Sequence, residues 1–141
     1  MKKALSILLC LVLSFLFLFS CSGAARIERE EWSLVSATRY GDVLYVSEAY
    51  HSEAPSAAVI DCTLKAKGGT LTLHDATNDK TYTGTYGERG APGPTTADYK
   101  IAFGTKDGRI LISAVTLAEG EKPIASLTLT VDDYVLSFIE K

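Results

Sequence analysis

From residue 32 onward, apolar and polar residues mostly alternate with a period of two. The clearest stretch places its apolar residues on one face of an extended chain and its polar residues on the other: Ile60, Cys62, Leu64 and Ala66 against Asp61, Thr63 and Lys65. Successive side chains of a β-strand point to opposite faces, so this stretch predicts a half-buried strand.

The same pattern predicts eight or nine strands along the chain. Their approximate ranges are 32–39, 43–49, 60–66, 70–74, 81–86, 99–104, 109–117, 125–131 and 134–138. The 43–49 run is the weakest, and residues 51–56 are expected to form a loop. Residues 109–117 are apolar on both faces, so we expect this strand to be central and covered on both sides.

Short turns connect most of these strands, and Lys67-Gly68-Gly69 and Asp132-Asp133 are two of them. Short links favour antiparallel neighbours, because parallel strands need long crossover connections. We therefore predict an all-β fold, an antiparallel up-and-down meander. It forms either a closed barrel or a β-sandwich, and the barrel is favoured because closure removes exposed sheet edges.

Residues 4–19 are almost wholly apolar and follow Lys2 and Lys3. A positive start, an apolar run and then small residues are typical of a secretory signal peptide. The alternative is a short transmembrane helix, but the run is shorter than the roughly 20 apolar residues that span a bilayer.

The end of this segment, Leu18-Phe19-Ser20-Cys21, resembles the lipobox of bacterial lipoproteins. The resemblance implies that residues 1–20 are removed and that Cys21 becomes an acylated N-terminus, which anchors the chain to a membrane. Residues 21–31 would be a tether and residues 32–141 a single all-β domain. We expect a location in the cell membrane or outer membrane, facing outside the cytoplasm; plain secretion and an uncleaved anchor are the alternatives.

The charge balance bears on possible partners. The chain has 14 basic and 17 acidic residues, a net charge of −3, and without Lys2 and Lys3 the net charge is −5. No basic stripe is present to neutralise phosphates, so we expect no nucleic-acid partner. Of the three cysteines, Cys10 lies in the leader and Cys21 is the predicted anchor, so Cys62 has no partner for a disulfide. We expect a monomer.

Three stretches together resemble small bacterial lipocalin-like lipoproteins: Glu31-Trp32-Ser33-Leu34-Val35-Ser36, Gly69-Thr70-Leu71-Thr72-Leu73-His74-Asp75 and Lys80-Thr81-Tyr82-Thr83-Gly84-Thr85-Tyr86. The resemblance covers residues 31–140. It implies a β-barrel that carries a small ligand.

Catalytic chemistry has little support in the sequence. His74 and Asp75 are adjacent on a strand, so their side chains point to opposite faces and cannot pair as a base and its partner. Cys62 lies on the apolar face of its strand, where burial makes a thiol inert. Two histidines and one remaining cysteine make a zinc site improbable. We expect no enzyme activity, no metal and no cofactor.

Aromatic residues supply the remaining signal. Five of them are candidates for the wall of a ligand pocket: Trp32, Tyr82, Tyr86, Tyr99 and Phe103. The alternative is that these rings form ordinary core. The first functional hypothesis is therefore a lipid-anchored, non-catalytic barrel that binds a small apolar or amphipathic ligand. The second is a protein-interaction module, an inhibitor or envelope-assembly factor, that acts through the Gly- and Pro-rich 87–97 loop with its residues Arg89, Pro92 and Pro94.

Overall fold

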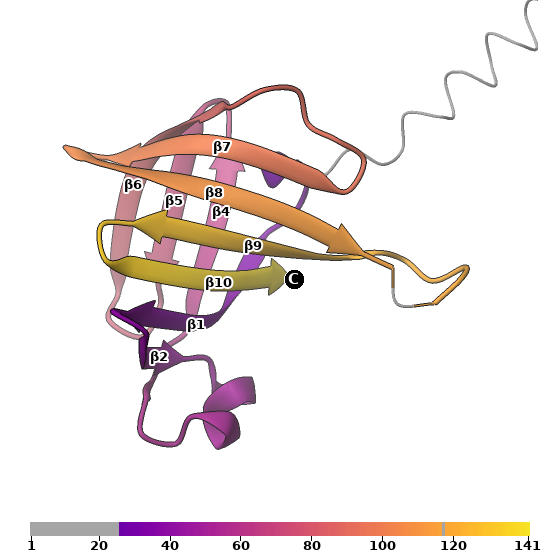
Figure 1. Ribbon diagram of the computed structural model, residues 1–141. Helices are drawn as coiled ribbons and strands as arrows, with labels where there is room; N and C mark the ends of the chain where they lie inside the picture. The colour runs from indigo at the N-terminus through magenta and orange to yellow at the C-terminus, as the bar shows by residue number, and fades with distance from the viewer. Residues whose placement is uncertain (1–25, 117) are drawn as a thin grey trace, which may run out of the picture.

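A computed structural model describes residues 26–116 and 118–141 (Figure 1). The predicted leader and the predicted acylation site, Cys21, lie outside the described residues. Ten strands are present in the described part of the chain: β1 (Trp32–Arg39), β2 (Asp42–Val46), β3 (Ala58–Val59), β4 (Cys62–Lys67), β5 (Thr70–Asp75), β6 (Lys80–Glu88), β7 (Thr96–Phe103), β8 (Lys106–Val115), β9 (Ile124–Val131) and β10 (Tyr134–Glu140).

Eight of these strands close into an antiparallel barrel in the order β1-β4-β5-β6-β7-β8-β9-β10. β1 closes it, because this strand pairs with β10 on one side, Leu34 opposite Phe138, and with β4 on the other, Trp32 opposite Leu64. If β2 and β3 are left out, strands that follow one another in the sequence are also neighbours in the sheet. The prediction of an all-β, antiparallel, up-and-down barrel is confirmed, and the chain does not form the alternative sandwich.

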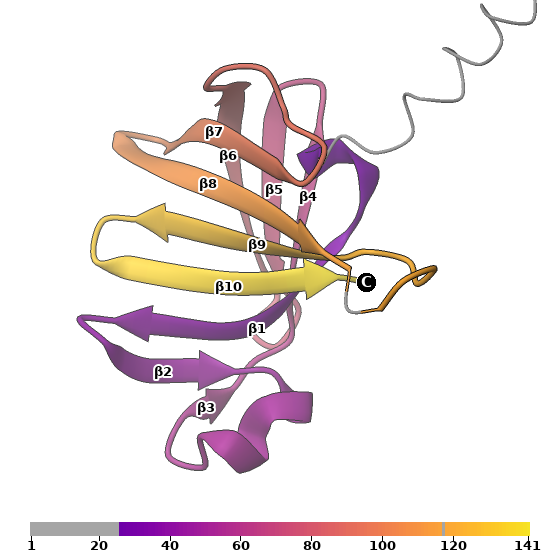
Figure 2. The ribbon, with the colours of Figure 1, turned by 45° about the vertical axis from the view of Figure 1, so that its right-hand side comes forward.

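β2 and β3 extend the sheet outside the barrel (Figure 2). β2 pairs with the second half of β1, and β3 pairs with β2 in parallel. Between them lies a 3₁₀ helix, η2 (Glu48–Glu53), so the predicted 43–49 strand ends at Val46 and part of the predicted 51–56 loop is helical. This parallel pair is possible because the 11 residues between β2 and β3 form a crossover long enough to reverse the chain.

Inward-facing residues of the eight barrel strands fill one continuous core. The largest side chains buried in it are Trp32, Tyr99, Phe138, Ile27, Leu64, Leu71, Ile110, Leu127 and Leu129. The outer face is open to solvent, which corrects the prediction for residues 109–117. In β8, Ile110 and Ile112 are buried, whereas Leu111 is 42% and Val115 is 53% exposed. An apolar residue on the outer face of a barrel has no second layer to cover it.

Residues 26–31 were predicted to be part of a tether, but in the structure they belong to the fold. They contain a second 3₁₀ helix, η1 (Ile27–Arg29), whose Ile27 side chain is fully buried in the core. All the strand pairings and core residues described above therefore lie within residues 26–141. This part of the chain contains every barrel contact that the structure describes. Among the described residues, no helix is both long enough and apolar enough to cross a membrane.

Candidate functional site: a cavity at the open end of the barrel

The two ends of the barrel are built differently, and η1 closes one of them. The indole Nε1 of Trp32 donates a hydrogen bond to the carbonyl oxygen of Ile27 at 3.0 Å, and the backbone N–H of Ile27 donates to the Tyr99 hydroxyl at 3.3 Å. Tyr86 packs edge-on against Tyr99 with ring centroids 5.9 Å apart, and its hydroxyl donates to the carboxylate of Glu28. Burial, together with this carboxylate, raises the pKa of Tyr86 to about 12. These contacts hold η1 across the closed end.

The opposite end contains a cavity of about 560 Å³. This volume lies within the range of about 300–1,000 Å³ that is usual for small-molecule sites. Its inner wall is apolar and comes from strands around the whole barrel: Leu34, Ala37, Ile60, Cys62, Leu73, Phe103, Leu129, Val131 and Leu136. Tyrosine, amide and charged side chains complete the lining: Tyr45, Asp75, Asn78, Lys80, Tyr82, Lys106, Asp132 and Tyr134. Such a lining suits a ligand that is mostly apolar and has one polar end.

A glycine on β6, Gly84, leaves space for the Phe103 side chain in one wall of this cavity. Gly84 faces inward on β6, and a Cβ atom there would lie 2.5 Å from the carbonyl oxygen of Ala102 and 2.8 Å from Cδ1 of Phe103. The Phe103 ring therefore lies directly against the β6 backbone. Glycine inside a strand often marks such a close approach. Gly84 is evident in the sequence, but its contact with Phe103 could not be predicted, because Phe103 lies on the neighbouring strand β7.

The five predicted pocket aromatics separate between the two ends of the barrel. Tyr82 and Phe103 line the cavity, and Tyr82 is 48% exposed. Trp32 and Tyr99 are buried beside η1 and Tyr86 packs against Tyr99, so these three rings close the other end. Alternation predicts which face of a strand a residue occupies, but it does not predict the position along the barrel axis. Tyr45 and Tyr134 were not among the predicted residues, because they lie on β2 and β10, away from the consecutive strands β6 and β7 that carry most of the predicted rings.

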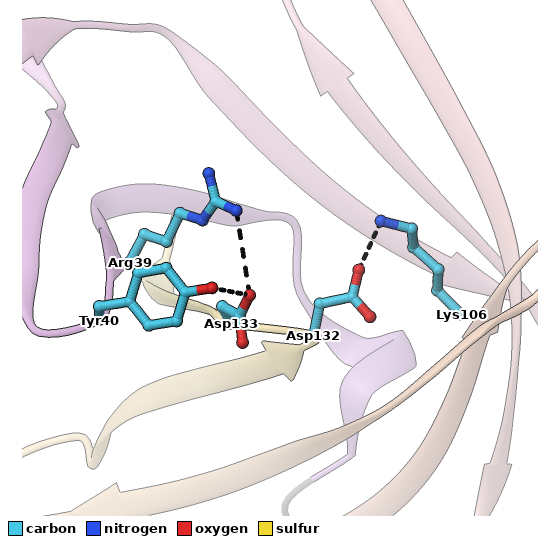
Figure 3. A network of polar contacts seen from close by, with 5 residues as sticks. All are labelled: Arg39, Tyr40, Lys106, Asp132 and Asp133. Atoms are coloured by element: carbon cyan, nitrogen blue, oxygen red, sulfur yellow. Dashed lines mark hydrogen bonds and ion pairs between the residues drawn. The ribbon is translucent and has the colours of Figure 1, made fainter.

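Polar contacts join three of the turns that form the rim of the cavity (Figure 3). Asp133 accepts a hydrogen bond from the Tyr40 hydroxyl at 2.5 Å, and its carboxylate lies 3.9 Å from the Arg39 guanidinium. Lys106 forms an ion pair with Asp132. These pairs connect the β1–β2, β7–β8 and β9–β10 turns, which lie side by side in Figure 2. The rim is thus held by contacts between side chains at the surface.

Asp75 is the buried acidic residue of the cavity wall, with 7% of its surface exposed. Its carboxylate accepts hydrogen bonds from the backbone N–H of Asn78 at 3.0 Å and from the Asn78 side-chain amide at 2.7 Å. His74 points elsewhere, because its Nδ1 lies 3.1 Å from the Thr81 hydroxyl. The two adjacent residues therefore form no dyad.

Cys62 lines the same cavity and is buried, as its position on the apolar face of a strand predicted. Burial, with smaller contributions from the Asp75 and Asp61 carboxylates, raises the pKa of the Cys62 thiol to about 12. A thiol of this pKa remains protonated at neutral pH and is a poor nucleophile.

The loop proposed for protein contacts lies at the closed end, away from the cavity. Strands β6 and β7 extend further than predicted, so the loop itself covers only residues 89–95. Arg89 and Pro94 are exposed, and Pro92 is partly buried. Backbone hydrogen bonds hold the loop at both ends, from Arg89 to the Asp98 carbonyl at 2.8 Å and from Gly93 to the Thr96 carbonyl at 2.8 Å.

Comparison with known proteins found no matching family model, no matching curated protein and no matching solved structure. The fold and the cavity described above are therefore the basis for any functional assignment.

Proposed function

We propose that this protein is a lipid-anchored binding protein of the bacterial cell envelope, which holds a small apolar or amphipathic ligand in the open end of its barrel without catalysis. The observation that supports the proposal most directly is the cavity of about 560 Å³, with an apolar wall and a polar rim. Burying an apolar ligand surface in such a site provides about 25 cal/mol per Å².

The closed end adds to this proposal through its relation to the anchor. The described chain starts at Arg26, beside η1, and the proposed acylation site Cys21 is five residues earlier. Five residues span at most about 18 Å. In the proposed arrangement the closed end is therefore tied near the membrane, and the cavity opens at the other end of the barrel.

Ligand binding can be tested with the secreted chain, defined as residues 22–141 exported behind an ordinary secretory signal. It contains every barrel contact that the structure describes. The neutral fluorescent probe N-phenyl-1-naphthylamine should bind and brighten, because it enters an apolar site. Leu73→Trp, which fills the cavity, should weaken the probe's affinity about tenfold or more.

Thr72→Trp is the matched control, because Thr72 precedes Leu73 on β5 and faces the outside of the barrel. It should leave the affinity unchanged. Circular dichroism would show that both variants are folded. A folded wild-type chain that leaves the probe dark, or a folded Leu73→Trp variant that binds as the wild type does, would refute the cavity as the binding site.

The anchor is tested separately in the full chain by growing cells with an alkyne-tagged fatty acid. The wild-type chain should incorporate the tag, Cys21→Ser should not, and the control Cys10→Ser should incorporate it. Equal tagging of the Cys21→Ser chain would refute acylation at this position without affecting the ligand proposal.

A further inference from the structure

The rim of the cavity carries an excess of negative charge. We define the rim as residues 39–42, 75–80, 104–107 and 131–134, the turns at the open end with the strand ends beside them. It contains six aspartates, namely Asp42, Asp75, Asp79, Asp107, Asp132 and Asp133. Only three basic residues lie among them: Arg39, Lys80 and Lys106. Charge of one sign around an apolar cleft attracts ligands of the opposite sign.

Ion pairs within the rim leave this excess of three negative charges unchanged, but they occupy most of the basic groups. Arg39 pairs with Asp133 and Lys106 pairs with Asp132, so two of the three basic groups are neutralised by the protein itself. Among the described residues, this leaves four carboxylates and the ammonium group of Lys80 outside the rim's ion pairs. Lys80 also lines the cavity, opposite Asp75 on the neighbouring strand, but it is exposed to water, whereas Asp75 is buried in the wall.

Asp75 differs from the other three carboxylates outside the ion pairs because it lies in the wall of the cavity. This carboxylate lines the cavity and is held in place by its two hydrogen bonds from Asn78. Those bonds come from neutral N–H groups, which orient the carboxylate and leave its charge unneutralised. A cation that enters the cavity would supply the missing opposite charge in a site partly shielded from water.

Tyrosine rings surround the same entrance. Tyr45, Tyr82 and Tyr134 all line the cavity, and the face of a tyrosine ring attracts cations. The protein already uses this attraction at the rim. The guanidinium carbon of Arg39 lies 5.2 Å from the ring centroid of Tyr134 and 5.2 Å from that of Tyr40.

From these observations we infer that the ligand is a cationic amphiphile, with an alkyl or other apolar part in the cavity and an ammonium group near Asp75 and the rim tyrosines. The inference rests on the proposed function and adds the chemical class of the ligand. An anionic amphiphile would bring its head group toward Asp75, with the exposed Lys80 as its main attraction.

Competition between three probes of equal chain length tests this inference in the secreted chain. Decyltrimethylammonium, decan-1-ol and decanoate, each below its micelle concentration, would displace N-phenyl-1-naphthylamine at neutral pH. We expect the cation to bind about tenfold more tightly than decanoate, with decan-1-ol between them. The preference should shrink between about 0.02 M and about 0.5 M sodium chloride, because salt screens the rim charges.

Two variants locate the charge that matters. Asp75→Asn should weaken the cation about tenfold relative to the neutral probe, since the amide keeps the shape of the side chain but loses its charge. Glu121→Gln, the same change of charge in the β8–β9 loop at the other end of the barrel, is the control and should alter neither affinity. Lys80→Gln should strengthen the cation slightly. If Asp75→Asn fails to fold, the double variant Asp79→Asn and Asp107→Asn should weaken the cation about threefold.

The outcomes distinguish this inference from the proposed function. Equal binding of the three decyl probes, tighter binding of decanoate, no displacement by any of them, or no effect of removing the rim carboxylates would overturn the cationic ligand. In each of these cases the cavity still binds the neutral probe, and the proposed function stands. Failure of the neutral probe itself to bind would overturn both.

Discussion

Single residues show how the environment inside the barrel decides chemistry. Cys62 is the clearest case, because its place on the apolar face of a predicted strand already indicated a buried, inert thiol, and the structure buries it. Asp75 shows the opposite situation. Alternation placed it on the same side of its strand as Leu71 and Leu73, but only the three-dimensional register shows that this carboxylate faces a cavity.

The Cys62 thiol should react slowly in the folded protein. Raising its pKa from 9.0 to about 12 lowers the thiolate fraction at pH 8 by about three orders of magnitude. In the secreted chain, whose only cysteine is Cys62, alkylation by iodoacetamide at pH 8 should be far slower than for the unfolded chain in urea. The folded rate should increase as the pH is raised. Equal rates for the folded and unfolded chains would contradict the buried position.

The strands that were predicted well have one buried face and one solvent-exposed face. β4, β5, β7 and β9 have such a pattern, and the structure contains each of them. η1 could not be predicted from the same pattern, because Ile27 is a lone apolar residue among charged ones. Its burial depends on partners far along the chain, such as Tyr99, which alternation does not reveal.

η1 covers one end of the barrel, and the contacts of its Ile27 side chain with the core should contribute measurably to stability. Ile27→Ala removes a fully buried side chain and should lower the free energy of unfolding by about 3 kcal/mol. Urea unfolding of the secreted chain, followed by the fluorescence of Trp32, measures this change. Val115→Ala is the control, because Val115 is 53% exposed and should cost little. Similar small losses in both variants would show that η1 is not part of the core.

The close approach of β6 and Phe103 leaves no room for a side chain at position 84. Gly84→Ala should lower the unfolding free energy by about 1–3 kcal/mol, because the new methyl group overlaps the Ala102 carbonyl and the Phe103 ring. Gly87→Ala on the same strand is the matched control, since its nearest neighbour is a flexible lysine carbon at 3.7 Å. Thermal unfolding compares the two variants. A Gly84→Ala variant as stable as the control would mean that Phe103 does not lie against β6.

At the scale of the whole molecule, short turns and alternating strands were enough to predict the closed antiparallel barrel. The pattern could not predict which aromatic rings would meet, because that depends on the stagger between strands around a closed barrel. Tyr82 and Phe103 consequently lie at the open end, while Trp32 and Tyr99 lie at the closed end. The rim aspartates come from four separate turns of the chain, and the antiparallel order of the strands brings these turns to the same end of the barrel.

The proposed ligand site is the cavity at the open end of the barrel. Titration of the isotope-labelled secreted chain with N-phenyl-1-naphthylamine, followed by amide and methyl chemical shifts, tests it most directly. We expect the largest changes at cavity residues such as Leu73, Leu129 and Leu136, and little change at Ile27 at the closed end. Changes centred on residues 89–95, or no saturable changes at all, would contradict it.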